Sequence, residues 1–338
     1  MRDRRSFELD DYVVAVAFER GGRRVAFALG DGTLALIDCS DPSSTPHTVT
    51  AHAGSCLSLA ADVGDEGFLT GGDDGLFARL SSDGRCTELG RFQRNWVEQV
   101  TAHPGHDRLA CAAGKQVAMY RASTGEELGR FDHPSTVADI DFAPSVPTLA
   151  AAHYNGITLH PLDPELARPS ILEWDGSHIL LSWAPDERCL VSSMQEGALH
   201  VVTLPDQEHQ GMQGYPFKVT SVDWLPHDTH LITSGSDGVV CWPYDGEGAF
   251  TAGEPRVIGF PDAPEEGALV LVVAADPTTD RMAAGCEDGS VRIIDFKKGE
   301  PSLLLAPCDL EVTALTFSPD GKILAIGMED GSAWLIDV

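Results

Sequence analysis

Two histidine pairs have a spacing that metal sites use. His103 and His106 form one HxxH string, and His227 and His230 form another. A zinc site needs three or four ligands that converge on one ion, whereas each string supplies two imidazoles. We therefore expect structural or surface histidines and no bound metal, with weak adventitious metal binding as the alternative.

Catalytic strings of the common kinds are absent from the sequence. It contains no GxSxG, HExxH, GxxxxGK[ST] or GxGxxG string, which are the arrangements that activate a serine, hold a catalytic zinc ion or cradle phosphates. We therefore expect no catalytic residues and no cofactor.

The cysteines do not form a framework. They are spread singly along the chain, without a CxxC string, at Cys39, Cys56, Cys86, Cys111, Cys189, Cys241, Cys286 and Cys308. This spacing fits neither a disulfide set nor a zinc ligand set. Reduced thiols are typical of cytoplasmic proteins, so we expect a cytoplasmic location.

Charge and hydropathy restrict the partners. The 338 residues include 23 Lys and Arg against 52 Asp and Glu, a formal net charge of −29. Nucleic acid binding needs clustered cations, so this balance argues against DNA or RNA and favours a basic protein or peptide. The first residues lack the apolar core of a signal peptide, and no run reaches the ~18 apolar residues that span a bilayer. We expect neither export by that route nor a membrane-embedded protein.

A repeat defines the elements that must position any functional side chain. Tight turns recur eight times, at Asp31-Gly32, Asp74-Gly75, Gly114-Lys115, Asn155-Gly156, Glu196-Gly197, Asp237-Gly238, Asp288-Gly289 and Asp330-Gly331. Their spacings are 40 to 43 residues, with one of 51, and such a period is typical of propeller blades. Aromatic residues near the end of the first strand should fill the layer between neighbouring blades, namely Phe18, Phe142, Trp183, Trp224 and Phe317.

The ends of the chain are expected to meet. Seven units are followed by a candidate fourth strand, whereas the eighth stops at Val338 without one. The run from Arg5 to Leu9, ahead of the first unit, can supply that outer strand and close the ring without an unfinished sheet edge. We therefore predict an all-β, eight-bladed β-propeller that comprises residues 1–338 as a single domain. A seven-bladed ring with one unit left over is the alternative.

The repeats resemble those of the WD40 family over nearly the whole chain. FSPDGKILAIGMEDGSAWLID in the eighth unit and MAAGCEDGSVRIIDF in the seventh carry the resemblance best. The resemblance implies a buried hydrogen-bonded tetrad of His, Ser or Thr, Asp and Trp in each blade. The partial matches are His52, Thr70 and Asp74 in the second unit, with Leu80 at the Trp position, and Tyr215, Thr233, Asp237 and Trp242 in the sixth, with Tyr215 at the His position. Because no unit has a complete tetrad, we expect apolar packing to contribute more to the stability of the blades than the tetrad hydrogen bonds do.

The same resemblance indicates where a partner would bind. WD40-like rings usually hold partners on the face made by the loops into the first strands and by the turns between the second and third strands. The candidates there are Arg94, Trp96, Tyr154, Trp174, His178, Tyr215, Phe217 and Lys218. Trp, Tyr and Arg dominate binding hot spots, although aromatic residues at these positions can instead pack between blades.

These observations predict a non-enzymatic, cytoplasmic scaffold that binds a protein or peptide on this face. The alternative is a propeller enzyme or a metal-dependent binding protein. It would use histidines and channel carboxylates such as Asp141 and Asp223, which occupy equivalent first-strand positions.

Overall fold

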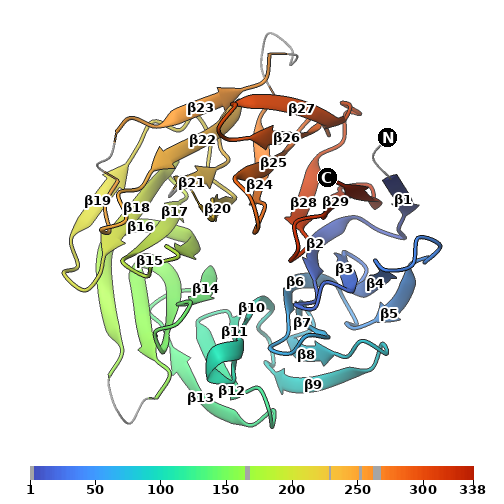
Figure 1. The fold of residues 1–338 in the computed structure, drawn as a ribbon. Coiled ribbons are helices and arrows are strands. Elements are labelled where there is room, and N and C mark those ends of the chain that lie inside the picture. The colour runs from blue at the N-terminus through green and yellow to red at the C-terminus, as the bar shows by residue number, and fades with distance from the viewer. Residues whose placement is uncertain (1–3, 164–167, 228–229, 251–252, 262–267) are drawn as a thin grey trace.

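A computed structural model describes residues 4–163, 168–227, 230–250, 253–261 and 268–338. Within these residues, the regular secondary structure is β-strand apart from one 3₁₀ turn, η1 (Pro104–His106). The strands form sheets that are arranged radially around a common centre (Figure 1). The all-β propeller predicted from the sequence is confirmed.

The first three units each form one antiparallel four-stranded sheet, with the first strand innermost. The first sheet contains β2 (Val13–Phe18), β3 (Arg24–Leu29), β4 (Thr33–Asp38) and β5 (His47–Thr50). The second contains β6 (Cys56–Ala61), β7 (Phe68–Gly72), β8 (Leu76–Leu80) and β9 (Cys86–Arg91). The third contains β10 (Val97–His103), β11 (Arg108–Ala113), β12 (Gln116–Arg121) and β13 (Glu127–Asp132).

The last three units repeat this plan. The sheet of the sixth unit contains β20 (Val222–Trp224), β21 (His230–Thr233), β22 (Gly238–Pro243) and β23 (Arg256–Gly259). That of the seventh unit contains β24 (Val270–Ala275), β25 (Arg281–Cys286), β26 (Val291–Asp295) and β27 (Glu300–Leu305). That of the eighth unit contains β28 (Val312–Phe317), β29 (Ile323–Met328), β30 (Ser332–Asp337) and β1 (Arg4–Glu8).

The fourth and fifth units share one sheet of six strands. Its strands are β14 (Asp139–Phe142), β15 (Thr148–Pro161), β16 (Ser170–Trp183), β17 (Cys189–Met194), β18 (Ala198–Thr203) and β19 (His209–Met212). β15 and β16 are each 14 residues long, and the two halves of each pair with different strands. The pairing of Tyr154 with Ser177 joins the two units. The described residues therefore form seven hydrogen-bonded sheets, the number kept as the alternative, and these sheets carry all eight sequence units.

The two ends of the chain close the ring, as predicted. β1 pairs antiparallel with β30, from Arg4 opposite Ile336 to Glu8 opposite Ser332. The Leu9 N–H continues the ladder by donating to the Gly331 carbonyl at 2.9 Å. Figure 1 shows β1 beside the strand that ends at the C-terminus. Without β1, β30 would present an unpaired edge.

The repeated turns need glycine for two reasons. Gly32 has a φ of 85°, which is accessible to glycine and strained for most other residues. A Cβ atom on Gly32 would also lie 1.9 Å from the carbonyl oxygen of Gly54, in the loop that enters the next unit. The turn and the neighbouring loop therefore approach each other through bare backbone.

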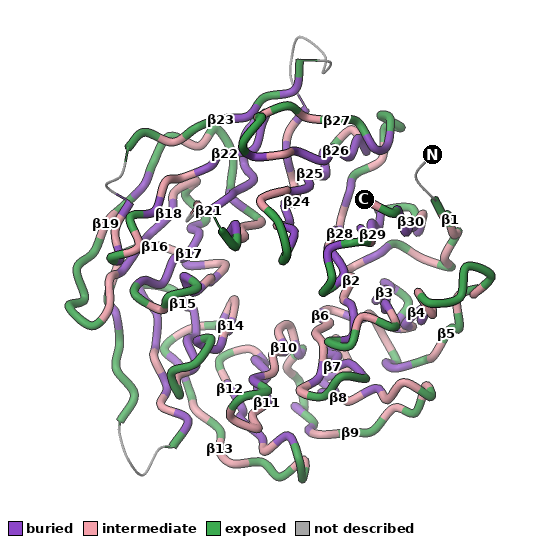
Figure 2. The backbone as a smooth tube through the Cα atoms, viewed as in Figure 1, coloured by how far each residue is buried: buried purple, intermediate pink, exposed green. Residues whose placement is uncertain are grey.

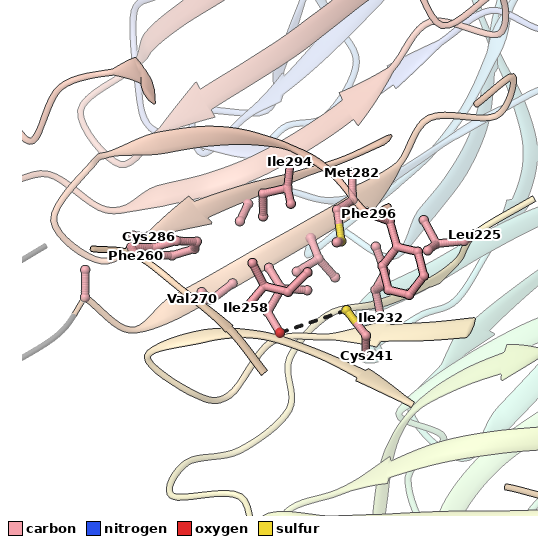
Figure 3. Packing of buried hydrophobic residues seen from close by; sticks show 14 residues of the cluster. Leu225, Ile232, Cys241, Ile258, Phe260, Val270, Met282, Cys286, Ile294 and Phe296 are labelled. Atoms are coloured by element: carbon pink, nitrogen blue, oxygen red, sulfur yellow. Dashed lines mark hydrogen bonds between the residues drawn. The ribbon is translucent and has the colours of Figure 1, made fainter. Parts of the chain in front are cut away.

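Apolar side chains fill the layers between neighbouring sheets. Figure 3 shows the layer between the sheets of the sixth and seventh units, where Ile232 and Cys241 belong to the same buried cluster as Met282 and Ile294. The five aromatic residues predicted for these layers are at most 8% exposed: Phe18, Phe142, Trp183, Trp224 and Phe317. Burial of one such side chain stabilises the fold by about 1.5–3 kcal/mol relative to leaving it in water.

Burial differs between the strands of one unit. The second strands are buried along almost their whole length, as in β17, because side chains on both faces contact neighbouring layers. The outer strands β13 and β23 are mostly exposed or intermediate (Figure 2). The outer strands therefore cover the ring, whereas the middle strands hold neighbouring units together.

Deletion of Arg2 to Leu9 should destabilise the sheet that β1 completes. We expect faster tryptic cleavage around Lys322 and a lower Tm, because β30 loses its partner and Phe7 and Leu9 leave their apolar cluster. Limited proteolysis and a thermal melt measure both effects. Ser6→Ala keeps the backbone pairing and serves as the control. Unchanged protease resistance in the deletion variant would refute the closing role of β1.

Candidate partner-binding face

One side of the ring is formed by the loops into the first strands and by the turns between the second and third strands. We call it the loop face; it includes residues 9–12, 92–96, 133–138, 174–177 and 213–221 and the repeated turns. Each loop is fixed by the turn of the preceding unit. The N–H of Phe92 donates to the Gly75 carbonyl at 2.8 Å, and the N–H of Val137 donates to the Gly114 carbonyl at 2.8 Å.

Exposed aromatic side chains gather on this face. Among the described residues, the aromatic side chains classed as exposed are Tyr12, Trp96, Tyr154 and Phe217, at 42%, 58%, 57% and 55%. All four belong to the loops and turns that define the loop face. Exposed large aliphatic residues, by contrast, include Ile171, Val257 and Leu303 on the outer strands. In the part of the chain that the structure describes, the exposed Phe, Tyr and Trp rings thus lie on the loop face.

Most of the predicted partner-binding residues are accessible on the loop face. Arg94 and Lys218 are exposed beside Trp96 and Phe217 in sequence. In the segment 92–96, Arg94 adopts a φ of 72°. In the segment 213–221, the backbone is held by the Phe217 N–H, which donates to the Gly235 carbonyl at 3.3 Å. Tyr154 is anchored through its N–H, which donates to the Ser135 hydroxyl at 2.9 Å.

Trp174 is positioned differently from the exposed aromatics. It is partly buried, and its indole stacks on His200 with ring centroids 4.6 Å apart and on His209 at 5.6 Å. The ring planes are within 11° and 3° of parallel, respectively. The indole is therefore held in one orientation.

His178 does not belong to the accessible surface, and its prediction as a partner-binding residue was wrong. It is 1% exposed. Its Nδ1 lies 2.6 Å from the Ser192 hydroxyl, and its Nε2 lies 3.0 Å from the Trp174 carbonyl. The imidazole turns inward because these partners satisfy both ring nitrogens within the fold.

Tyr12 was missed by the sequence analysis. It stands directly before β2, in the same relation to its strand as Trp96 has to β10. That relation follows from the repeat pattern, so the position of Tyr12 on the loop face could have been predicted from the sequence.

The tetrad-like residues make hydrogen-bonded chains in both units. In the second unit, His52 lies 3.0 Å from Asp74 through Nδ1 and 3.1 Å from Thr70 through Nε2. Leu80, at the expected Trp position, is fully buried and apolar. These bonds link the incoming loop, the second strand and the following turn.

In the sixth unit, Tyr215 takes the central place. Its hydroxyl lies 2.7 Å from the Thr233 hydroxyl and accepts the Trp242 indole N–H at 2.6 Å. Asp237 instead accepts a hydrogen bond from Ser236 at 3.1 Å. Tyr215 therefore has a structural role, and it is only partly exposed on the loop face.

Histidines form hydrogen-bonded contacts in the fourth and fifth units, and all of them except His209 are buried. His133 and His160 face each other through their Nε2 atoms at 2.9 Å, and His200 Nε2 lies 2.8 Å from His209 Nδ1. His153 Nε2 lies 2.8 Å from the Thr158 hydroxyl. The two units that share one sheet thus also contain polar side-chain contacts in their interior.

Burial disfavours the charged form of four of the histidines. Desolvation and the neighbouring imidazoles lower the pKa of His160 to about 4 and that of His200 to about 3. Burial also lowers the pKa of His133 and of His178. A charged imidazole at these four positions would lose the solvation that it has in water, so protonation opposes the folded state.

The two HxxH strings make local structural contacts. The rings of His103 and His106 are 4.5 Å apart, and His106 donates through Nε2 to the Ser145 carbonyl at 2.8 Å. His227 Nε2 lies 3.1 Å from the Thr278 carbonyl, and His230 packs on Phe296 at 4.5 Å. The two strings belong to different units.

The inner-strand carboxyls are held within the fold. Asp223 accepts the Ala275 N–H at 2.8 Å from the next inner strand, and Asp139 accepts the Leu181 N–H at 2.7 Å. Burial raises the pKa of Asp223 to about 6 and that of Asp139 to about 7. Burial, together with the negative charge of Asp139, raises the pKa of Asp141 to about 8.

Two searches of the described residues for other kinds of site were negative. Within them, no three or more His, Cys, Asp and Glu side chains are grouped so that they could hold one metal ion. No helix in this part of the chain has the length and apolar character needed to cross a membrane.

Comparison with known proteins identifies the class of repeat. The sequence pattern of the family described as WD domain, G-beta repeat matches residues 207–242, 262–295 and 304–337. The chain therefore carries WD40 repeats in these three places, in agreement with the resemblance inferred from its sequence. The three matches fall in the sixth, seventh and eighth units.

Several curated proteins are similar to this chain. Autophagy-related protein 16 of Arabidopsis thaliana is 22% identical over 307 residues, covering 89% of this chain and 59% of the plant protein. Telomerase protein component 1 of Rattus norvegicus is 23% identical over 356 residues, covering 98% of this chain and 12% of the rat protein. Human WD repeat-containing protein 90 is 30% identical over 125 residues, 36% of this chain and 7% of that protein. The chain thus spans only part of each relative.

A solved structure shows the same fold. The crystal structure of the computationally designed Ika8 protein aligns with a TM-score of 0.75 at 18% identity, covering 98% of both chains. The WD40 propeller, together with a relative named for its WD repeats, supports a protein-interaction scaffold.

Tyr215→Phe should lower the free energy of unfolding by about 1–3 kcal/mol, because the Trp242 N–H and the Thr233 hydroxyl lose their shared partner in a partly buried site. Urea unfolding measures the change. Tyr12→Phe removes the same hydroxyl from an exposed ring and should have little effect. Equal stability of the two variants would contradict the structural role of Tyr215.

The buried histidines should make stability depend on pH. The pKa of His160 falls from 6.5 to about 4 on folding, so the unfolded chain binds more protons between these values. The contribution of His160 to the free energy of unfolding should therefore fall as pH drops below 6.5, by on the order of 2 kcal/mol at pH 4.5. Urea unfolding at pH 7 and pH 4.5 measures this loss.

A variant separates this effect from that of the carboxyls. The raised pKa values of Asp139 and Asp141 act in the opposite direction, because these folded-state carboxyls take up protons as pH falls. The difference in stability between wild type and His160→Gln should therefore shift by on the order of 2 kcal/mol in favour of the variant from pH 7 to pH 4.5, whereas His47→Gln, at an exposed position, should follow the wild type. An equal change in all three proteins would refute the histidine effect.

Proposed function

We propose that this protein is a non-enzymatic scaffold that binds a protein or peptide partner on its loop face. The observation that carries the proposal is the exposure of Tyr12, Trp96, Tyr154 and Phe217, which stand in four different units on the same side of the ring. Large exposed rings beside Arg94 are the residue types that contribute most to binding energy at interfaces. The rigid sheets beneath the loops limit the entropy lost when a partner binds.

The charge of the chain favours a basic partner. With a formal net charge of −29, the protein attracts cationic surfaces over long range and repels nucleic acids. Association should accordingly be fast at low salt and slower at high salt. The eight free thiols suit a reducing compartment, so we place the protein in the cytoplasm.

Truncation of the exposed rings should remove the partner. We expect the triple variant Trp96→Ala, Tyr154→Ala, Phe217→Ala to lose at least about tenfold in affinity, because hot-spot side chains each contribute more than about 1 kcal/mol. Immobilised wild-type and variant proteins are compared for capture from the lysate of source cells at low and high salt, followed by titration of the identified partner.

A matched control tests whether the effect is specific to the loop face. The variant Ile171→Ala, Val257→Ala, Leu303→Ala removes three exposed apolar side chains from outer strands and should retain the partner. Absence of any partner at either salt concentration, or equal capture by both triple variants, would overturn the proposal.

A further inference from the structure

A groove lies at the margin of the loop face, in the fifth unit. It has a volume of about 380 Å³, and its lining includes Trp174, Asp175, Met194, Glu196 and Leu199. These residues come from four places in the chain: the middle of β16, the end of β17, the turn between β17 and β18, and the start of β18. The groove therefore exists only when the fourth and fifth units are joined.

The apolar wall of the groove is rigid. The indole of Trp174 is held by its parallel stacking on His200 and His209. Gly211 also lines the groove, and a Cβ atom there would lie 3.4 Å from Cζ2 of Trp174. The glycine thus leaves the edge of the indole clear, and Leu199 adds a buried apolar surface beside it.

The rim of the groove is acidic. Asp175 is exposed and follows the indole directly in sequence. Glu196 is oriented by the Ser177 N–H, which donates to its Oε1 at 3.3 Å, so that Oε2 remains as a further acceptor. The side chains that line the groove include these two carboxylates and no Lys or Arg. A flat aromatic wall beside two carboxylates is complementary to a flat cation.

We propose that this groove binds an arginine side chain of the partner. The inference rests on the proposed function, because it assigns a chemical preference to part of the loop face. The guanidinium would lie along the Trp174 indole and donate hydrogen bonds to Asp175 and Glu196. A planar guanidinium fits this arrangement better than an ammonium, because it can both stack on a ring and donate to two carboxylates.

The test uses a short peptide with a single arginine, Gly-Ser-Arg-Ser-Gly, blocked at both ends. Its counterpart carries citrulline, which has the same shape and no charge. In protein labelled with 5-fluorotryptophan, the ¹⁹F resonance of Trp174, identified by Trp174→Phe, should move saturably with the arginine peptide. The resonance of Trp96 should not move. We expect the citrulline peptide to bind at least about tenfold more weakly, since it lacks the charge that strengthens the hydrogen bonds.

Charge-neutral variants keep the test independent of folding. Glu196→Gln and Asp175→Asn should each weaken the arginine peptide about fivefold, and Glu173→Gln, which removes a nearby exposed charge that does not line the groove, should change binding less than twofold. If Trp174→Phe does not fold, the fluorescence anisotropy of a labelled arginine peptide is measured with the three charge variants, and their affinities test the assignment. Equal binding of the two peptides, or equal binding by Glu196→Gln and Glu173→Gln, overturns the arginine assignment.

Failure of the arginine assignment is distinguishable from failure of the proposed function. Loss of partner capture on truncation of Trp96, Tyr154 and Phe217, with no preference for arginine over citrulline, would leave the loop face as the binding surface and overturn only the groove assignment. Arginine binding without any captured partner would overturn the scaffold proposal only.

Discussion

The structure depends on apolar packing between sheets that have no continuous hydrogen bonding to most of their neighbours. Each layer is filled by side chains from two units, as where Ile232 and Met282 share one cluster. Polar links between inner strands, such as that from Ala275 to Asp223, are added to this packing. Because a layer exists only if both of its sheets are present, each unit relies on the next, and the ring is stable as a whole rather than sheet by sheet.

The sequence predicted the parts of the fold that follow from local periodicity. The recurring turns, the buried aromatic residues such as Trp183, and the pairing of β1 with β30 were all visible in residue types and spacing. The sheet shared by the fourth and fifth units was not, because it depends on one long-range pair, Tyr154 with Ser177. A repeat pattern specifies strands within a unit and carries little information on contacts between units.

The residues of the candidate site differ in the same way, because some could be predicted from the repeat pattern and others could not. Trp96 and Phe217 could be placed on the loop face because each precedes a first strand in the repeat. His178 could not be excluded in advance, since its inward orientation arises from hydrogen bonds to Ser192 and to the Trp174 backbone. The acidic groove was also invisible, because its lining comes from segments that meet only through folding. The direction in which a side chain points and the presence of a groove are determined by the assembled ring.

Closure by β1 also sets the order in which the molecule can be completed. Arg4 is synthesised before its partner Ile336, and the strands of every other sheet are made between the two. While the chain emerges from the ribosome, earlier sheets can pack one on another, but β1 must wait without its strand partner until β30 is available. The slowest contact of folding should thus be the one between the two ends, since it closes the largest loop in the chain.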